Sequence, residues 1–188
     1  REKYVSLEQD EQSVIVTTDS GETHTSRYVI GCDGLHSSVA ADLGVVKPVP
    51  RSAKRYGLRQ HFATPPWSSL IEVYYSKDAE VYITPVSVDT VGVAVLGRKG
   101  VNLEHAVAGI PDLAARLAGA APASTLRGAG PFPHKARTQR TGRVLLVGDS
   151  GGYVDAITGE GLRVGFAQAR AAIDSLKSDS PWRYPRAW

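Results

Sequence analysis

The sequence predicts an α/β protein, α+β overall, in which a mainly antiparallel β-sheet is inserted into a domain built on parallel strands. Two observations favour this fold. Residues 144–147 are apolar without a polar break, as in a strand buried on both faces of a parallel sheet, and a helical pattern follows from about residue 160. Before them, residues 55–96 hold four strand-like segments separated by turn residues, which is typical of an antiparallel meander.

The first fifty residues predict three short strands and one short helix. Ser37 is suited to open the helix and Gly44 to close it. The Lys-Pro-Val-Pro segment at residues 47–50 indicates a crossover into the inserted sheet, so we place the first part of the parallel domain at residues 1–50. The strands are expected at residues 5–7, 14–16 and 28–30.

Residues 51–128 are expected to form the inserted sheet domain, and the first domain resumes at residues 129–188. A helical pattern covers residues 102–118, although Pro111 should kink or divide it, and a return strand is expected near residues 124–127. A meander of this kind has one face to pack and one face that can line a substrate pocket. The expected strands are residues 56–62, 70–75, 80–85 and 90–96, and the candidate substrate side chains are Arg59, His61, Tyr74 and Tyr82.

Composition excludes several classes of protein. A net charge of +3 over 188 residues is too small to indicate a nucleic-acid binder. No run approaches the roughly 18 consecutive apolar residues that span a membrane. The single cysteine, Cys32, leaves no disulfide framework, so we expect a cytoplasmic protein and interpret Cys32 as a buried packing residue. No cluster has metal-ligand spacing and no Ser or Cys lies in a nucleophile elbow, so we predict no metal site and name no catalytic side chain.

One segment of the chain is strongly basic. Between Leu113 and Gly148 there is no acidic residue, and such a run could attract an anionic cofactor or a substrate phosphate. A solvated loop that rejoins the first domain is the alternative interpretation. The basic residues are Arg116, Arg127, Lys135, Arg137, Arg140 and Arg143.

Asp33 and Asp149 each follow a predicted strand at its carboxyl end, where open α/β sheets bind their ligands. A carboxylate there can accept hydrogen bonds from sugar-like hydroxyls, and glycines let the backbone approach a flat ring. The helix that begins near Glu160 would stabilise negative charge at its start. An ordinary connection with Asp149 as a cap is the alternative. The apolar face of this helix is expected to hold Leu162, Phe166, Ala169 and Ile173.

Two segments, GDSGGYVDAITGEG at 148–161 and RYVIGCDGLHSSVAADLGV at 27–45, resemble conserved aspartate motifs of the FAD-dependent monooxygenase and reductase superfamily. This superfamily includes p-hydroxybenzoate hydroxylase and geranylgeranyl reductase. The two aspartates are 116 positions apart, about the interval into which the superfamily inserts its substrate domain. The resemblance implies part of a Rossmann-like FAD-binding domain with an inserted sheet. It implies that FAD is bound by Asp33, Gly34, Gly148, Asp149, Gly159, Glu160, Gly161 and Leu162.

The resemblance also implies an oxidoreductase that acts on a small organic substrate with NAD(P)H as reductant. Three hypotheses remain: a monooxygenase, a double-bond reductase of the geranylgeranyl-reductase type, and a truncated or non-catalytic relative. The Thr-Gly-Glu-Gly pattern at 158–161 favours the reductase branch. The superfamily opens with a GxGxxG loop that this sequence lacks, so we interpret the chain as a fragment without that amino-terminal unit. It departs from the usual motifs at Ala40, Ala41, Ala156 and Arg163.

Overall fold

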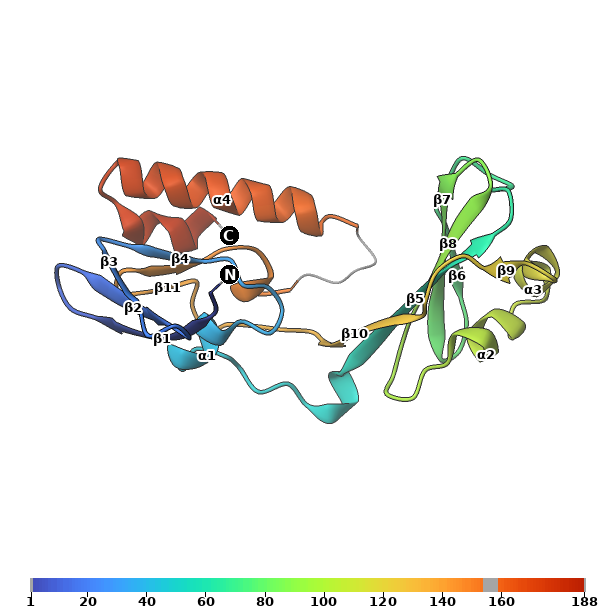
Figure 1. The fold of residues 1–188 in the computed structure, drawn as a ribbon, viewed down its shortest axis with the longest axis horizontal. Coiled ribbons are helices and arrows are strands. Elements are labelled where there is room, and N and C mark those ends of the chain that lie inside the picture. Colours follow the sequence, from blue (N-terminus) through green and yellow to red (C-terminus); the bar gives the residue numbers. More distant parts are fainter. Residues whose placement is uncertain (1, 154–158, 188) are drawn as a thin grey trace. The chain divides into compact units, whose positions relative to one another are not determined.

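A computed structural model describes residues 2–153 and 159–187 of the chain, which divides into two compact units (Figure 1). Unit 1 comprises Arg1–Val49 and Pro133–Trp188, and unit 2 comprises Pro50–Phe132. The second boundary lies four residues beyond the one expected at residue 129, because residues 127–132 continue as a strand of the unit 2 sheet. The mixture of helices and strands confirms the predicted α/β class.

Unit 1 is built around a pair of parallel strands, β4 and β12, with β11 antiparallel to β12. The three residues of β12 are fully buried, as their apolar run predicts. A separate antiparallel sheet contains β1, β2 and β3; the sequence did not indicate β3, because all four of its side chains are exposed and none is apolar. The strands are β1 (Tyr4–Gln9), β2 (Val14–Thr18), β3 (Thr23–Ser26), β4 (Val29–Gly31), β11 (Arg140–Thr141) and β12 (Val144–Leu146).

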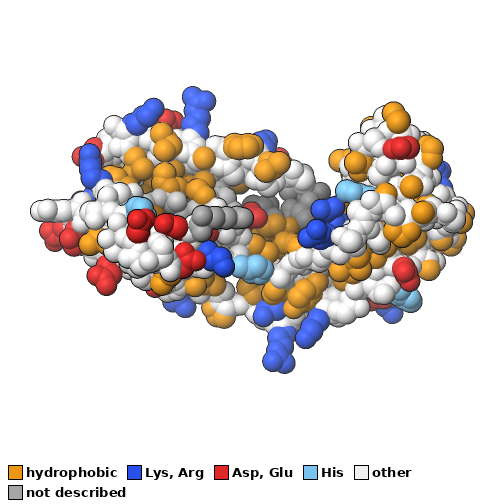
Figure 2. Space-filling view, in the orientation of Figure 1, with side chains coloured by type: hydrophobic (Ala, Val, Ile, Leu, Met, Phe, Trp, Pro, Cys, Tyr) orange, Lys and Arg blue, Asp and Glu red, His pale blue; other side chains and the backbone are white. Residues whose placement is uncertain are grey.

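The long helix of unit 1 packs through small and polar side chains. The residues it buries are Gln168, Ala172 and Ser175, while Leu162 and Phe166 on the apolar face are 78% and 72% exposed. Figure 2 shows hydrophobic side chains at the surface over α4. The expected apolar face is therefore not the packed face. The helical elements of unit 1 are α1 (Ser38–Asp42), η2 (Gly148–Ser150), α4 (Gly161–Lys177) and η4 (Pro181–Ala187).

Unit 2 is an antiparallel sheet with the order β10-β5-β8-β7-β6, to which β9 adds by pairing with β5. Pro111 begins a second helix, so it divides the predicted helical segment rather than kinking it. The elements are η1 (Arg51–Ala53), β5 (Arg55–Ala63), β6 (Glu72–Tyr75), β7 (Ala79–Ser87), β8 (Thr90–Gly97), α2 (Leu103–Ala108), α3 (Pro111–Leu117), β9 (Ala121–Pro122) and β10 (Arg127–Phe132).

The core of unit 2 lies between one face of this sheet and the two helices (Figure 1). Alternate residues of β7 and β8, such as Val81 and Val93, point to this face and pack against Leu103 and Leu113. Within unit 2, all of whose residues are described, no helix covers the opposite face, which we call the open face. None of the helices in the described parts of the chain is long and apolar enough to cross a membrane.

Replacing Leu113 by alanine should lower the free energy of unfolding by about 2–5 kcal/mol, because it leaves a cavity in a fully buried site. Leu126, which is 51% exposed, provides the control, and its replacement by alanine should change stability by less than about 0.5 kcal/mol. Urea unfolding followed by circular dichroism measures both variants. Equal losses would show that α3 does not close the unit 2 core.

Candidate functional site

The parallel pairing of β4 and β12 brings the two motif aspartates to one edge of the sheet. The strands end at Gly31 and Leu146, so Asp33 and Asp149 both follow at their carboxyl ends. The Val147 amide donates a hydrogen bond of 2.9 Å to the Gly31 carbonyl. The buried hydroxyl of Ser150 donates to the same oxygen at 2.6 Å, so the two loops are joined directly.

Asp33 holds the first loop in place. One carboxylate oxygen accepts a hydrogen bond from the Ser37 hydroxyl at 2.6 Å, and the other accepts from the Val39 amide at 3.1 Å. Ser37 caps α1 as predicted, because its hydroxyl oxygen accepts from the Ala40 amide. The Asp33 carboxylate therefore ties its own loop to the start of α1.

Asp149 differs from Asp33 in having a free carboxylate. It is half-buried in η2, and no described residue donates a hydrogen bond to its side chain. Its neighbours are held firmly instead. The Gly148 amide donates to Gln168 Oε1 on α4 at 2.7 Å, and His134 Nε2 donates to the Ser150 carbonyl at 3.0 Å.

Three of these supporting residues, His134, Ser150 and Gln168, were missed from the sequence. All three are polar and at least nine-tenths buried, a combination that hydrogen bonding must compensate. One feature of the sequence could have indicated Gln168, because it is a polar residue in the middle of the helix that follows the second motif. Its burial could not be inferred, because the expected packed face was the apolar one.

The backbone around Asp149 is bare. A Cβ atom built at Gly34, Gly148, Gly159 or Gly161 would meet no heavy atom within 4 Å, and the first three have φ values of +81°, +68° and +63°. Side chains disfavour this left-handed region, so glycine is required there. The backbone at these four glycines therefore faces open space, and Gly148 directly precedes the free carboxylate.

The start of α4 completes this edge. Glu160 precedes the helix but makes no side-chain hydrogen bond to its backbone; its Oε1 accepts from Arg163 Nε at 3.1 Å and from Nη2 at 2.7 Å. The Glu160 side chain therefore does not cap the first-turn amides, which include that of Leu162. Ala156 and Thr158 of the second motif lie outside the described residues.

These groups fit a flavin dinucleotide. The free carboxylate suits sugar-like hydroxyls, the bare glycine backbone suits a flat ring, and the amides at the helix start suit negative charge. The only cysteine of the chain, Cys32, is not among these groups. Cys32 is exposed rather than buried, because β4 ends at Gly31 and Cys32 lies in the loop beyond it. Partial desolvation by the surrounding loop, and then the negative charge of Asp33, raise the pKa of the Cys32 thiol.

Three of the four candidate substrate residues share the open face of unit 2. Arg59 lies directly opposite Ala94 in the sheet, and Ala94 lies opposite Tyr82, so all three point to one side. His61 follows Arg59 by two residues, and its Nε2 is 3.4 Å from Arg59 Nη1. Gly92 makes room for His61, because a Cβ there would lie 3.3 Å from its ring.

Tyr74 lies on the other face, against the helices. Its hydroxyl donates to Glu72 Oε2 at 2.6 Å, and Trp67 Nε1 donates to the same oxygen at 3.0 Å. These hydrogen bonds, with Tyr74 first, hold the pKa of Glu72 below its usual range. Arg116 stacks over the Trp67 ring at 5.1 Å. Tyr74 therefore points away from the other three candidate substrate residues. The sequence could not show this, because the face of a side chain depends on the register between neighbouring strands.

The basic segment does not form one group. Arg116 and Arg127 belong to unit 2, and the other four basic residues belong to unit 1. In unit 1, Arg143 is used internally, donating to the Glu11 and Arg27 carbonyls. The charge of this segment is therefore distributed between two units by the fold.

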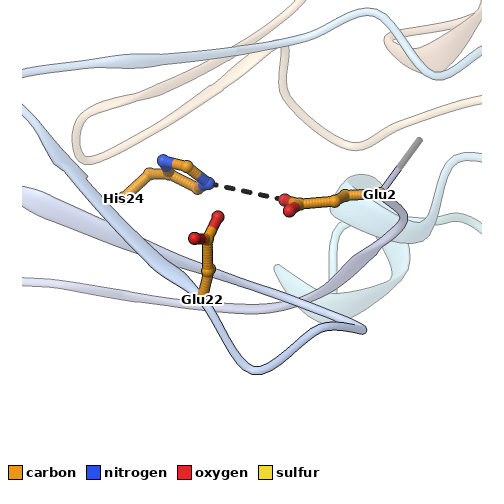
Figure 3. A group of neighbouring side chains, drawn as sticks. All are labelled: Glu2, Glu22 and His24. Atoms are coloured by element: carbon orange, nitrogen blue, oxygen red, sulfur yellow. Dashed lines mark ion pairs between the residues drawn. The ribbon is translucent and has the colours of Figure 1, made fainter.

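The antiparallel sheet of β1, β2 and β3 brings Glu2, just before β1, to two side chains at the start of β3 that the sequence did not connect with it (Figure 3). The ligand atoms of Glu2, Glu22 and His24 lie within 4.8 Å of one another, and His24 Nε2 is 3.6 Å from Glu2 Oε2. Hydrogen bonds, that of Thr18 first, lower the pKa of Glu2. All three side chains are exposed, as in a surface ion pair.

Comparison with known proteins bears on this site. Residues 1–178 match the family described as FAD binding domain. No curated protein matches the sequence. The fold matches those of the flavin-dependent brominase Bmp2 (18% identity, TM-score 0.84, 100% of this chain and 54% of that chain) and the flavin-dependent halogenase CmlS (18%, 0.82, 98% and 38%).

A further match is a flavoprotein/dehydrogenase from Cytophaga hutchinsonii, with 15% identity and a TM-score of 0.79 over 94% of this chain and 49% of that chain. At these identities the three structures establish the fold alone. The chain spans between 38% and 54% of their lengths.

Replacing Gln168 by leucine should lower the free energy of unfolding by about 1–3 kcal/mol, because the Gly148 amide loses its buried acceptor. Ala167→Leu adds the same side chain at the adjacent exposed position and serves as the control. Urea unfolding measures stability, and hydrogen exchange at the Gly148 amide should accelerate only in Gln168→Leu. Unchanged exchange would contradict the role of Gln168.

The lowered pKa of Glu72 predicts a pH-dependent contribution to stability. Because the folded state holds the proton less tightly, the contribution is complete above the ordinary carboxyl pKa of about 4.3 and is lost as pH falls through the folded-state pKa. The stability difference between wild type and Glu72→Gln should therefore shrink in acid. Tyr74→Phe, which removes the principal hydrogen bond, should weaken this pH dependence. A difference independent of pH between 3 and 7 would contradict the assignment.

Proposed function

This chain belongs to the FAD binding domain family, and we propose from this premise that unit 1 binds FAD at the carboxyl ends of β4 and β12. The observation that carries the proposal is the free carboxylate of Asp149 beside a bare glycine backbone. The FAD residues are those of the two motifs, Asp33, Gly34 and Gly148–Asp149 in the loops and Gly159–Leu162 at the start of α4.

Each residue has a separate task in this proposal. Asp149 accepts hydrogen bonds from the ribityl hydroxyls, and Gly159 and Gly161 let the flavin ring lie against the backbone. The first-turn amides of α4 stabilise negative charge on the ring. Asp33 contributes indirectly, because both of its carboxylate oxygens accept hydrogen bonds that position the loop that carries Gly34.

The protein to which this chain contributes is, in our proposal, an FAD-dependent oxidoreductase of the monooxygenase type with NAD(P)H as reductant. Bound FAD supplies the redox chemistry, accepting hydride and passing electrons to oxygen or substrate. The chain's own residues bind and orient it. Two of the matched folds are flavin-dependent halogenating enzymes, and the third is a flavoprotein/dehydrogenase, which supports redox chemistry of this class.

A double-bond reductase is the second candidate, favoured by the Gly-Glu-Gly sequence at 159–161. Oxygen uptake coupled to NAD(P)H oxidation separates the two candidates, since a reductase transfers its electrons to the substrate. Uptake that rises with an added small organic substrate supports the monooxygenase.

For the substrate we propose the open face of unit 2. Arg59, His61 and Tyr82 lie on this face around the small residues Gly92 and Ala94, and the His61 ring packs over Gly92. The Tyr82 hydroxyl is oriented by its 2.6 Å hydrogen bond to a carboxylate on its own strand. A guanidinium, an imidazole and a phenol suit a small, polar organic molecule.

Replacing Asp149 by alanine should weaken FAD binding by about 10- to 100-fold, because hydrogen bonds to a charged group are each worth about 1.5–3 kcal/mol. Asp174→Ala removes a carboxylate from an exposed position of α4 and should leave the affinity within about twofold. FAD titration followed by visible absorption, on a protein that contains this chain, measures both. Equal affinities of wild type and Asp149→Ala would overturn the site.

A further inference from the structure

We propose that the open face of unit 2 takes an anionic substrate, a small organic acid whose carboxylate or phosphate group is held by Arg59 and Arg127. This inference rests on the proposed function, because it names the substrate class of the face assigned there. Arg127 on β10 lies directly opposite Arg59 on β5, so both side chains project from the open face. Both residues are exposed, so a ligand can reach them.

Two directly opposed arginines are unfavourable in a sheet unless an anion joins them. Opposed residues of antiparallel strands have Cβ atoms about 4.5–5.5 Å apart, and like charges at that separation destabilise the pair. Neither Arg59 nor Arg127 forms an ion pair with any residue that the structure describes. A carboxylate or phosphate between them would accept charge-assisted hydrogen bonds from both guanidinium groups and remove the repulsion.

Arg55, on the same strand and the same face as Arg59, provides an internal comparison. Its Nη2 lies 2.6 Å from Glu80 Oε1, and the Tyr82 hydroxyl donates to Glu80 Oε2 at 2.6 Å. The negative charge of Glu80 is therefore compensated by Arg55. The strands of unit 2 carry one other carboxylate, that of Glu72, which lies on the opposite face of the sheet. The open face thus holds an excess of positive charge at the opposed arginines.

The opposed arginines begin a straight row across the sheet. Arg59 lies opposite Ala94 on β8, and Ala94 lies opposite Tyr82 on β7. Because neighbouring strands are about 4.7–4.9 Å apart, the Tyr82 backbone lies roughly 10 Å from that of Arg59. Ala94 between them carries a single methyl group and is half-buried. This row suits a molecule whose anionic group lies at the arginines and whose body extends over Ala94 toward the Tyr82 ring.

Polar contacts hold the chain before Arg127 against β5 without using either guanidinium. The Ala123 amide donates to the His61 carbonyl at 2.8 Å, and the His61 amide donates to Ser124 Oγ at 2.9 Å. The one contact of the Arg59 guanidinium is to the His61 ring at 3.4 Å, and an imidazole supplies no negative charge. The fold therefore positions the arginines and leaves their charge for a ligand.

The test titrates phenylacetate, phenyl phosphate and the uncharged phenylacetamide into the full chain without FAD, followed by isothermal titration calorimetry. We expect saturable binding of at least one anion at millimolar concentration or below, and which anion binds distinguishes carboxylate from phosphate. Phenylacetamide should bind at least tenfold more weakly. Arg127→Gln should weaken the anion at least tenfold, while Arg98→Gln, an exposed position beyond the end of β8, should stay within twofold. Absence of saturable anion binding, or equal affinity of Arg127→Gln, would overturn the inference.

Stability provides a second measurement that needs no probe molecule. Arg127→Gln removes the repulsion between the opposed arginines, so it should raise the urea midpoint at low ionic strength, and added salt should reduce this gain. Arg98→Gln should not change the midpoint in this way. If Arg127→Gln lowers the midpoint, Arg127 is a structural residue and the inference fails.

Ala94→Phe separates this inference from the proposed function on which it rests. The larger side chain should obstruct the row and weaken anion binding at least tenfold, in a protein that circular dichroism shows to be folded. If Ala94→Phe loses binding that Arg127→Gln retains, the open face binds substrates by other groups and only this inference fails. If both variants bind like wild type, the open face is not the substrate site and that part of the proposed function fails too.

Discussion

The candidate FAD site depends on the parallel pairing of β4 with β12, strands that are separated by more than a hundred residues of sequence. A glycine at its end allows close packing. A Cβ at Gly31 would lie 3.0 Å from the Leu146 side chain and 3.1 Å from that of Val39, so a larger residue would require these side chains to shift. Asp33 and Asp149 follow the two strands, so the loops that carry them are held together by this pairing.

A second constraint comes from α4, which supports the site through polar rather than apolar contacts. Gln168 holds Gly148 in a left-handed conformation, and the small side chains of Ala172 and Ser175 let the helix approach closely. The helix whose amino end is part of the proposed site also fixes the loop that carries Asp149. Preorganisation of this kind lowers the conformational cost of binding, since the groups that contact the ligand are already in place.

Much of the strand and helix order followed from local patterns, while the assignment of side chains to faces did not. Apolar runs, turn residues and Pro111 predicted the meander, the buried strand and the divided helix, because these signals act within a few residues. Tyr74, Cys32 and the packed face of α4 depend on sheet register, on where a strand stops and on a distant backbone amide. Asp149 could be proposed as a ligand-binding residue because a carboxylate followed by glycines at a strand end has a chemical meaning of its own.

Strand direction gives the parallel pair two chemically different ends. The carboxyl end carries bare backbone and a free carboxylate, which suit the hydroxyls and the flat ring of a dinucleotide. The amino end carries arginines, and there Arg143 ties the turn at Glu11 to the segment at Arg27 through backbone carbonyls. Different groups therefore hold the two ends together. At the carboxyl end the loops are joined by the Ser150 hydroxyl and held to α4 by the Gln168 side-chain amide, and at the amino end the segments are joined by the Arg143 guanidinium.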